Sequence, residues 1–230
     1  MRTHEVVLQR IESDLAAGRV VVGARLPAER ALAEELGVGR SSVREALRVL
    51  EAMGVVRTSA GSGPDAGAIV AADPAASIGT ALRLHVATST LPVRDLVQTR
   101  ILLETWAVRE AAVRAAGSPL PDVEALLDAM DDPALTPDRF HRLDADLHVA
   151  LTGLAGNVLI EAMMSSLREA IHGYVMAAVS RLSDWPAVAA ELRREHREIV
   201  AAIRRGHGAK AAELVQVHIA GFHALVDPGA

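Results

Sequence analysis

The chain contains no cysteine among its 230 residues. This absence excludes disulfide bonds, thiolate metal ligands and a cysteine nucleophile. Aromatic residues make up only 2% of a chain that is half apolar, so small aliphatic contacts between helices must build the core. No apolar run approaches the roughly twenty residues that cross a bilayer, and the polar start MRTHEVVLQR is not a signal peptide. We therefore expect a soluble, cytoplasmic protein that has no membrane partner.

The formal net charge of −5 arises in one part of the chain. Residues 1–70 contain nine arginines and nine acidic residues, whereas the remainder holds 15 basic and 20 acidic residues. Within residues 40–57, four arginines stand against two glutamates. A local basic strip on an otherwise acidic protein suits DNA docking with little non-specific binding, because only the strip attracts phosphates. The alternative is a solvated, charged helix face.

Hydrophobic periodicity predicts a winged helix-turn-helix in the first 72 residues. Val7, Ile11 and Leu15 recur every four residues and mark the first amphipathic helix. The glycine-rich residues 60–67 separate two short strand patterns that form a hairpin. The expected elements are a helix that ends near residue 17, helices at 28–36 and 40–53, and strands at 55–59 and 68–71.

From about Ile78 onward, nearly every segment has helical periodicity. Short breaks separate about seven helices, which predicts an antiparallel all-α bundle. The fold class is therefore mostly α, with an N-terminal winged helix-turn-helix, a small β-hairpin wing and a C-terminal helical bundle. The expected domains are residues 1–72 and 78–230, joined by a linker at 73–77. The breaks fall at residues 91–92, 117–121, 131–137, 156–157, 184–186 and 206–208.

The segment from Leu26 to Arg57, LPAERALAEELGVGRSSVREALRVLEAMGVVR, resembles the winged helix-turn-helix of GntR-family bacterial transcription regulators. The resemblance covers nearly the whole segment and implies that the partner is double-stranded DNA. It implies DNA contacts at Arg30, Arg40, Ser41, Ser42 and Arg44.

The chemistry of these residues agrees with DNA reading. Arg40 stands at the start of the second helix of the motif, where N-terminal residues reach base edges in the major groove. The guanidinium fork of Arg44 can bind guanine O6 and N7 together. The alternative is that Arg44 only pairs with Glu45 or Glu51 on the surface.

Two features depart from the family pattern. Ala28 and Gly39 stand where hydroxyl residues are usual, so each helix lacks a preferred N-cap, worth about 1 kcal/mol against alanine and less against glycine. The wing, residues 59–67, is longer than usual and has no basic residue. Gly61 or Gly63 can still let the wing approach the DNA backbone, and Gly63 is the expected contact.

The spacing of four residues in the C-terminal half predicts a metal site. His196 and His218 each stand ten residues from a glycine of the break Gly206-His207-Gly208. In an antiparallel helix pair, ten residues climb about 15 Å from the turn, so both imidazoles reach the same height. Asp144 and His148 are one helical turn apart and can present an oxygen and a nitrogen from a third helix. Three imidazoles and a carboxylate are typical metal ligands.

This half of the chain also resembles the FCD type of ligand-binding domain, found in the FadR subgroup of the same family. The resemblance rests on the stretches DLVQTRILLET, HRLDADLHVALTGLAGN, EHREIVAAIRRGH and VQVHIAGF. It implies a divalent transition metal, with Zn favoured and Ni, Mn or Fe also suited to the ligands. The ligands that the resemblance implies are Asp144, His148, His196 and His218.

Octahedral coordination would leave two positions open for a small carboxylate metabolite. The resemblance implies that Arg100 binds that carboxylate, in the bidentate geometry that a guanidinium favours. The alternative is that Arg100 only pairs with Glu104, one turn further along the helix. The other histidines are expected to be surface or hydrogen-bonded side chains: His4, His85, His141, His172, His207 and His223.

Together these features predict a metabolite-responsive transcription regulator and not an enzyme. We expect a repressor that acts as a homodimer and reads a palindromic operator. One alternative is a metal-dependent hydrolase, because histidine and carboxylate clusters also build such sites. Against it, the sequence has no HExxH motif, nucleophile elbow or phosphate loop. The other alternative is a metal-free regulator whose helical bundle serves only to dimerise.

Overall fold

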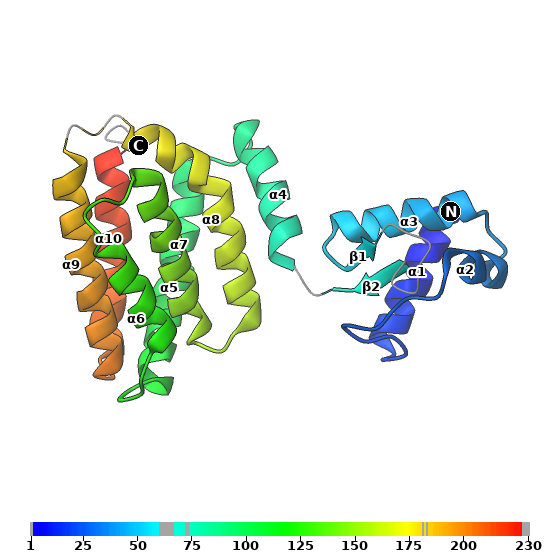
Figure 1. The fold of residues 1–230 in the computed structure, drawn as a ribbon, viewed down its shortest axis with the longest axis horizontal. Coiled ribbons are helices and arrows are strands. Elements are labelled where there is room, and N and C mark those ends of the chain that lie inside the picture. Colours follow the sequence, from blue (N-terminus) through cyan, green and yellow to red (C-terminus); the bar gives the residue numbers. More distant parts are fainter. Residues whose placement is uncertain (1, 60–66, 72–73, 181, 183, 227–230) are drawn as a thin grey trace. The chain divides into compact units, whose positions relative to one another are not determined.

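The computed structural model describes residues 2–59, 67–71, 74–180, 182 and 184–226. The chain divides into two compact units, Met1–Ile78 and Gly79–Ala230. The first unit contains helices followed by a two-stranded antiparallel sheet (Figure 1), in the order of the winged helix-turn-helix that the sequence predicts. Its elements are α1 (Thr3–Ala16), α2 (Glu29–Leu36), α3 (Arg40–Ala52), β1 (Val56–Ser59) and β2 (Gly67–Val70).

The core of the first unit forms where the apolar faces of its helices meet. Val7 and Ile11 are buried, because they lie one turn apart on an apolar face of α1, which packs against α3. Gly37 ends α2 with φ at 62°, a left-handed conformation that strains residues with a Cβ atom. As the sequence predicts, Ala28 and Gly39 give no side-chain cap to the helices that follow them.

The hairpin packs against this core through one face of its strands. Val56 and Val70 are register partners, and both are buried. Arg57 pairs with Ile69 on the other face, and Arg25 forms an isolated antiparallel bridge to the same Ile69. Because residues directly opposite in a sheet project from the same face, Arg25 and Arg57 flank Ile69 at the base of the wing.

The remaining described residues form seven helices, and each predicted break lies at a junction between two of them. Residues 74–77, expected to be linker, instead form the first turn of α4, because the fixed φ of Pro74 suits a helix start.

None of the described helices combines the length and the apolar character needed to cross a membrane. The helices are α4 (Pro74–Ala87), α5 (Val93–Arg114), α6 (Pro121–Met130), α7 (Pro137–Gly153), α8 (Val158–Val179), α9 (Trp185–Arg204) and α10 (Gly208–Val226).

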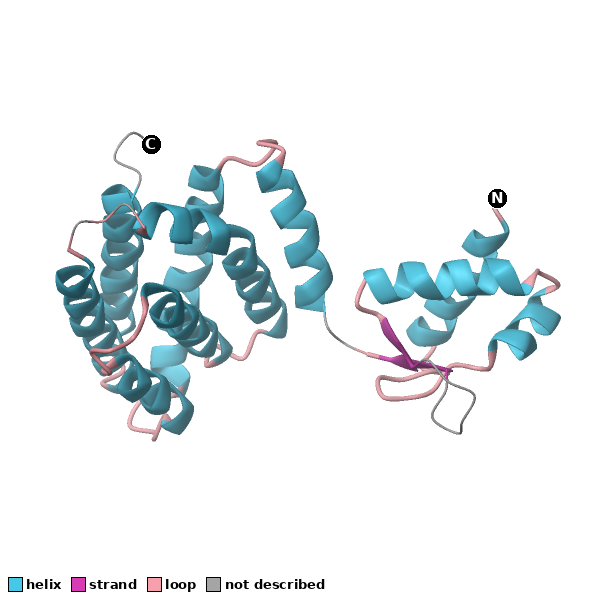
Figure 2. Ribbon diagram, turned by 45° about the horizontal axis from the view of Figure 1, so that its top comes forward, coloured by secondary structure: helices cyan, strands magenta, loops and turns pink. Residues whose placement is uncertain are grey.

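The helix α5 is central to the bundle. It packs against α7, α8, α9 and α10, and Figure 1 shows it among these helices. Figure 2 shows that helices joined by loops build this unit. The small buried side chains of Ala107 and Ala111 let the neighbouring helices approach closely. A Cβ atom at Gly208 would lie 3.1 Å from the carbonyl oxygen of Arg109, so a larger residue there would push the start of α10 away from α5. This close approach sets the position of α10.

Candidate functional site

Two exposed arginines of α3 share one carboxylate. The side chains of Arg40 and Arg44 are 60% and 56% exposed. Oε2 of Glu29, in the first turn of α2, lies 3.7 Å from Nη2 of Arg40 and 2.8 Å from Nε of Arg44. Exposed ion pairs of this kind contribute little to stability. Both guanidinium groups can therefore exchange Glu29 for another anion, such as a phosphate.

Among the described residues, Arg44 pairs with Glu29 and not with the two glutamates expected as its surface partners. Glu51 instead accepts hydrogen bonds from the hydroxyl and the backbone N–H of Thr58, at 2.5 and 2.8 Å. These two bonds, the hydroxyl first, lower the pKa of Glu51. Glu51 thereby connects the end of α3 to β1. Glu45 lies 3.6 Å from Nδ1 of His4.

The other residues predicted to contact DNA differ in their exposure and in their partners within the protein. The side chain of Arg30 is 79% exposed and pairs with the glutamate one turn further along α2. Ser41 is exposed at the start of α3. The hydroxyl of Ser42 shares a hydrogen bond of 2.8 Å with the hydroxyl of Thr3. Gly63 lies outside the described residues.

Two basic residues at the base of the wing were not predicted. Arg25 and Arg57 flank Ile69, and both are exposed. The absence of basic residues applies only to the loop at 59–67. A signal was available, because strand alternation places Arg57 on the face opposite the buried Val56. The base of the wing thus carries two arginines, a residue type that can meet phosphates.

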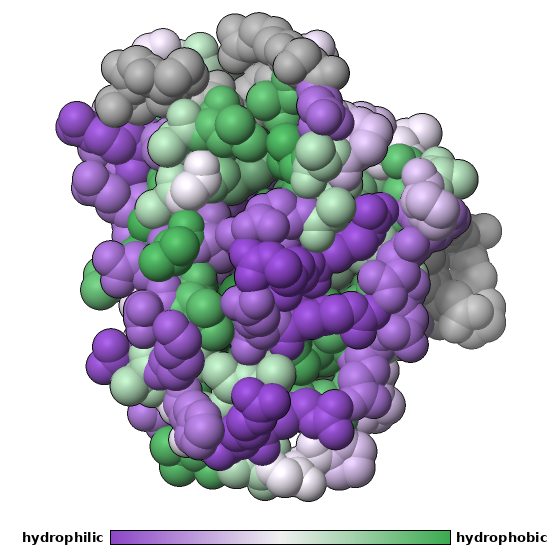
Figure 3. All heavy atoms as spheres, turned by 90° about the vertical axis from the view of Figure 1, so that its left-hand side faces the viewer, coloured by the Kyte–Doolittle hydropathy of each residue, from purple (hydrophilic) through white to green (hydrophobic). Residues whose placement is uncertain are grey.

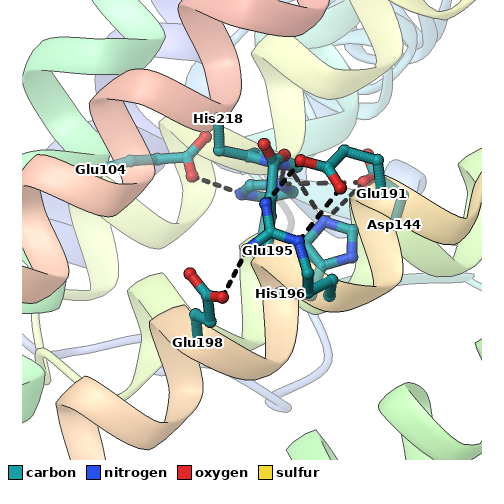
Figure 4. Close-up of polar contacts among 9 residues, drawn as sticks. Glu104, Asp144, Glu191, Glu195, His196, Glu198 and His218 are labelled. Atoms are coloured by element: carbon teal, nitrogen blue, oxygen red, sulfur yellow. Dashed lines mark hydrogen bonds and ion pairs between the residues drawn. The ribbon is translucent and has the colours of Figure 1, made fainter. Parts of the chain in front are cut away.

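Four side chains from three helices converge in the second unit. Nε2 of His218 lies 3.2 Å from Nε2 of both His148 and His196. Oδ1 of Asp144 lies 3.0 Å from Nε2 of His196 and 3.8 Å from that of His148. The four donor atoms all lie within 4.8 Å of one another, and Figure 4 shows the labelled members of the cluster side by side. The structure therefore brings together the four residues that the sequence spacing singled out.

The helices place these side chains as their spacing requires. Asp144 and His148 lie one turn apart on α7. His196 on α9 and His218 on α10 stand at equal heights above the turn, where Gly206 has φ of 72°. The three histidines are buried, and the side chain of Asp144 is 14% exposed.

The donor set fits a divalent transition metal. With Zn–N distances near 2.1 Å, the ligand nitrogens of a tetrahedral ion lie roughly 3.4 Å apart. The observed separation of two imidazole pairs is 3.2 Å. Two unprotonated ring nitrogens at that distance repel each other unless a cation or a proton lies between them. Three imidazoles and a carboxylate, without a thiolate, suit Zn, Ni, Mn or Fe.

Two carboxylates that were not predicted as part of the site orient two of the imidazoles. Glu104 of α5, 1% exposed, contacts Nδ1 of His148. Glu195 of α9, 24% exposed, lies 2.7 Å from Nδ1 of His218. Such contacts fix the ring and leave Nε2 for a metal. Among the described residues, Nδ1 of His196 has no hydrogen-bond partner. The helical pattern of α5 could have identified Glu104, because it falls on the buried face of that helix.

The electrostatics of the site favour ionised carboxylates and a neutral imidazole. Burial raises the pKa of Glu104, but the charges of Arg100 and the neighbouring histidine outweigh it and lower the pKa to about 2. Burial also raises the pKa of Asp144, and the hydrogen bond from His196 with nearby positive charge brings it well below its ordinary value. Burial lowers the pKa of His218 well below its usual range. Metal binding needs these protonation states.

A cavity of about 50 Å³ adjoins the cluster. Arg100, His141 and Arg168 line it together with apolar side chains such as Met164. Nε of Arg100 donates a hydrogen bond of 2.6 Å to Oε1 of Glu104. The ion pair that sequence reasoning left as an alternative is therefore present, and Arg100 also borders the cavity.

The outer face of α9 is charged. Arg194 pairs with Glu191 and Glu198 on this face. Figure 3 views the molecule from the α9 side and shows a band of hydrophilic side chains there. Figure 4 shows Glu195 on the same helix, next to the imidazole cluster. Glu195 is the glutamate of this helix that contacts His218.

Comparison with family models assigns a family to each part of the chain. The model described as bacterial regulatory proteins, gntR family, matches residues 3–64. The model of the FCD domain matches residues 95–221. The first match includes α1, α2, α3 and β1, and the second includes all four clustered donors.

Individual regulators are similar to the chain over most of its length. The Glc operon transcriptional activator of Escherichia coli (strain K12) is 27% identical over 205 residues, covering 86% of this chain and 79% of the relative. The HTH-type transcriptional repressor NanR of Enterobacter sp. (strain 638) is 28% identical over 222 residues, covering 94% and 82%. The solved structure of Streptococcus agalactiae GntR superposes with a TM-score of 0.70 at 26% identity, covering 95% of this chain and 97% of that one.

Proposed function

Because the chain belongs to the gntR family of bacterial regulatory proteins and carries an FCD domain, we propose that it is a repressor whose operator binding responds to a small carboxylate metabolite at a metal centre. Its family and relatives make it a DNA-binding transcription regulator and not an enzyme. This assignment argues against the hydrolase alternative. The proposal adds four features to this assignment: the metal, the effector, the dimer and the direction of regulation.

The N-terminal unit would read the operator through α3. Arg40 and Arg44 are exposed on that helix, and Ser41 lies at its start, where backbone and side-chain donors reach bases and phosphates. Arg30 from α2 and Arg25 from the wing base would contact the DNA backbone. Acting on DNA, the protein would work in the bacterial cytoplasm.

One observation carries the metal part of the proposal: three Nε2 atoms and one carboxylate oxygen lie within 4.8 Å of one another in a buried site. We propose that Asp144, His148, His196 and His218 hold the ion. When bound, a divalent metal, Zn before Ni, Mn or Fe, supplies the positive charge that attracts an anionic effector.

The adjoining cavity would hold the effector. Its volume is about 50 Å³, so the ligand is small. Arg100 uses Nε to bind Glu104, and its terminal N–H groups would bind a carboxylate in bidentate fashion. Glu104 thereby keeps the guanidinium of Arg100 oriented at the cavity wall.

Dimerisation would use an exposed apolar stripe on the second unit. Leu102, Trp106 and Val113 lie on one face of α5 and are 69%, 40% and 77% exposed. Val217, on the adjacent α10, is 60% exposed. Exposed apolar side chains gathered on one helix face mark contacts with partners, and we propose a second copy of the chain as that partner. A two-fold dimer would match a palindromic operator.

The effector would act by favouring one arrangement of the two recognition helices in the dimer. A ligand can shift such an equilibrium only by its difference in affinity for the two states, which must reach a few kcal/mol. We propose repression as the direction, which is the action named for the Enterobacter relative. A reporter gene placed behind the operator decides between repression and activation.

Metal content and operator binding test the proposal together. Protein purified without a nickel column should carry about one equivalent of a transition metal per chain and should select one palindrome from genomic fragments. Less than about a tenth of an equivalent, with acid binding unaffected by chelator, would favour the metal-free regulator. Failure to prefer any fragment, with or without small acids, would contradict the proposed operator.

A further inference from the structure

Glu29 connects the start of α2 to two arginines of α3. Its Oε2 atom accepts a hydrogen bond of 2.8 Å from Nε of Arg44 and lies 3.7 Å from Nη2 of Arg40. Glu29 stands in the first turn of α2, and Leu32, one turn further along, is buried in the core that α2 shares with α3. Packing of α2 therefore fixes the position from which the carboxylate reaches the two arginines.

The contact between Glu29 and Arg44 uses one corner of the guanidinium. The hydrogen bond comes from Nε, whereas the two terminal nitrogens carry the donors of the guanidinium fork. A guanine presents O6 and N7 to such a fork in the major groove. The side chain of Arg44 is 56% exposed, so a carboxylate at Nε restricts a group that would otherwise rotate freely. The fork is thereby oriented before DNA arrives.

The charge of Glu29 acts against binding to unrelated DNA. Every DNA sequence carries phosphates, which attract exposed arginines regardless of the bases. A phosphate that takes Arg40 or Arg44 must first displace Glu29. A guanine that binds the fork of Arg44 leaves Glu29 at Nε, so operator binding avoids that cost. Because specificity is the difference between two binding free energies, a carboxylate in this position raises it.

We propose that Glu29 is a specificity-determining residue, which orients Arg44 for base reading and withholds Arg40 and Arg44 from phosphates. This inference rests on the proposed function, because it requires α3 to read the operator through Arg44. The alternative is a structural role, since an acidic residue in the first turn also stabilises a helix through its dipole. The two roles differ in what they change: a less stable α2 lowers the affinity for every DNA sequence alike.

Fluorescence anisotropy with the full-length protein tests the inference. The probes are the palindrome selected from genomic fragments and a scrambled duplex of the same length and composition. Glu29→Gln keeps the shape of the side chain and removes its charge. The affinity for the scrambled duplex should rise about two- to fivefold, whereas the affinity for the palindrome should not rise. For the scrambled duplex, the slope of log affinity against log salt should steepen by about 0.9 for each arginine that gains a phosphate.

Glu34→Gln is the matched control. Glu34 lies on the same helix and accepts a hydrogen bond of 2.8 Å from Nε of Arg30, so the two variants lose the same kind of contact. Arg30 is proposed to contact the DNA backbone, which carries no sequence information. Glu34→Gln should therefore change both affinities alike and keep their ratio. In an Arg44→Ala background, Glu29→Gln should lower the ratio less than in the wild type, because the fork that it orients is gone.

The outcomes separate the inference from the proposed function. An affinity ratio that Glu29→Gln leaves unchanged would overturn the inference, and lower affinity for both duplexes would then make the residue structural. An equal fall of the ratio in Glu34→Gln, or in the Arg44→Ala background, would also overturn it. In these cases the proposed operator reading still stands. Equal weakening of both duplexes by Arg44→Ala alone, or failure of the wild type to prefer any palindrome, would overturn that reading and the inference together.

Discussion

Glu104 contacts Nδ1 of His148 with one carboxylate oxygen and accepts a hydrogen bond from Arg100 with the other, at 2.6 Å. With 1% exposure it has almost no contact with solvent. The same carboxylate therefore orients a proposed metal ligand and a proposed effector-binding group. The affinities for metal and effector should be coupled through this residue, because binding at His148 or at Arg100 changes the charge that acts on the carboxylate of Glu104.

Glu104→Gln should weaken metal binding by about 10- to 100-fold, because the carboxylate that orients His148 is lost. Competition titration against a chelator of known affinity measures the change. Glu198→Gln removes a carboxylate from the exposed face of α9 and should have little effect. Equal metal affinity in the two variants would mean that the contact with His148 does not tune the site.

His218→Ala should abolish the stabilisation that metal gives. Metal at a hundred times its dissociation constant adds about 2.7 kcal/mol to the free energy of unfolding of the wild type. A chelator should therefore lower the unfolding midpoint of the wild type and leave that of His218→Ala unchanged. His207→Ala, in the turn between the same two helices, is the control and should respond like the wild type. A chelator effect of equal size in His218→Ala would remove this residue from the ligand set.

Arg40→Ala and Arg44→Ala should each weaken operator binding by about 1–3 kcal/mol, because a base-reading guanidinium is lost. Fluorescence anisotropy with labelled operator and with unrelated DNA measures both the affinity and its specificity. Arg205→Ala is the control, because it removes the same charge from an exposed position in the second unit. If the two α3 variants lose affinity equally for all sequences, these residues contact phosphates and not bases.

Trp106→Glu should shift the protein from dimer to monomer, since it places a charge in the exposed stripe of α5. Sedimentation velocity gives the assembly state, and operator affinity should fall with it. Leu159→Glu is the control, because Leu159 is 64% exposed on α8 and lies outside the stripe. A dimer that survives Trp106→Glu but is lost in Leu159→Glu would move the interface away from α5.

The pH dependence of unfolding tests the ion pairs of Asp14. Its carboxylate lies 2.6 Å from Nε of Arg19 and 2.8 Å from Nε of Arg10. The hydrogen bond from Arg19, helped by that from Arg10, lowers the pKa of Asp14 below its ordinary value of 3.8. The resulting stabilisation is present above that ordinary value and is lost as the pH falls through the lowered pKa of the folded state.

Asp14→Asn should therefore reduce the free energy of unfolding near neutral pH and have little effect near pH 2. Urea unfolding followed by circular dichroism at both pH values measures the difference. Glu12→Gln, an exposed position on the same helix, should have a small effect at both. If Asp14→Asn lowers the free energy of unfolding equally at both pH values, the carboxylate charge is not the source of the stabilisation.

Helix boundaries and the two pairs of clustered donors, Asp144 with His148 and His196 with His218, were predictable because both depend on local spacing, whereas the resemblance to the FCD domain brought the two pairs together. Proline stands in the first turn of α6, α7 and α9, and glycine ends α2, so these boundaries follow from backbone restrictions. His196 and His218 meet because two arms of equal length leave one turn. In each case the structure repeats what a single helix pair or turn requires.

Partners between elements could not be predicted in this way. Glu104 meets His148 across 44 positions, and Glu29 meets Arg44 across 15. Each pair depends on the rotation of one helix against another, which is set by packing in the core. Ring orientation has the same origin: the aromatic neighbours of His141 come from its own helix and from α9 and α10. Periodicity shows that such a residue is buried, but not which atoms it meets.

The turn between α9 and α10 fixes the register of the cluster. Inserting one residue between His196 and the turn would change the position of the His196 imidazole relative to the turn, and an insertion between the turn and His218 would do the same to the His218 imidazole. In either case the imidazole would rotate by about 100° about the helix axis and move about 1.5 Å along it. An insertion of seven residues would nearly restore the direction but would displace the ring by about 10 Å. The segment from 196 to 218 is therefore a part of this domain where insertions and deletions would not be tolerated.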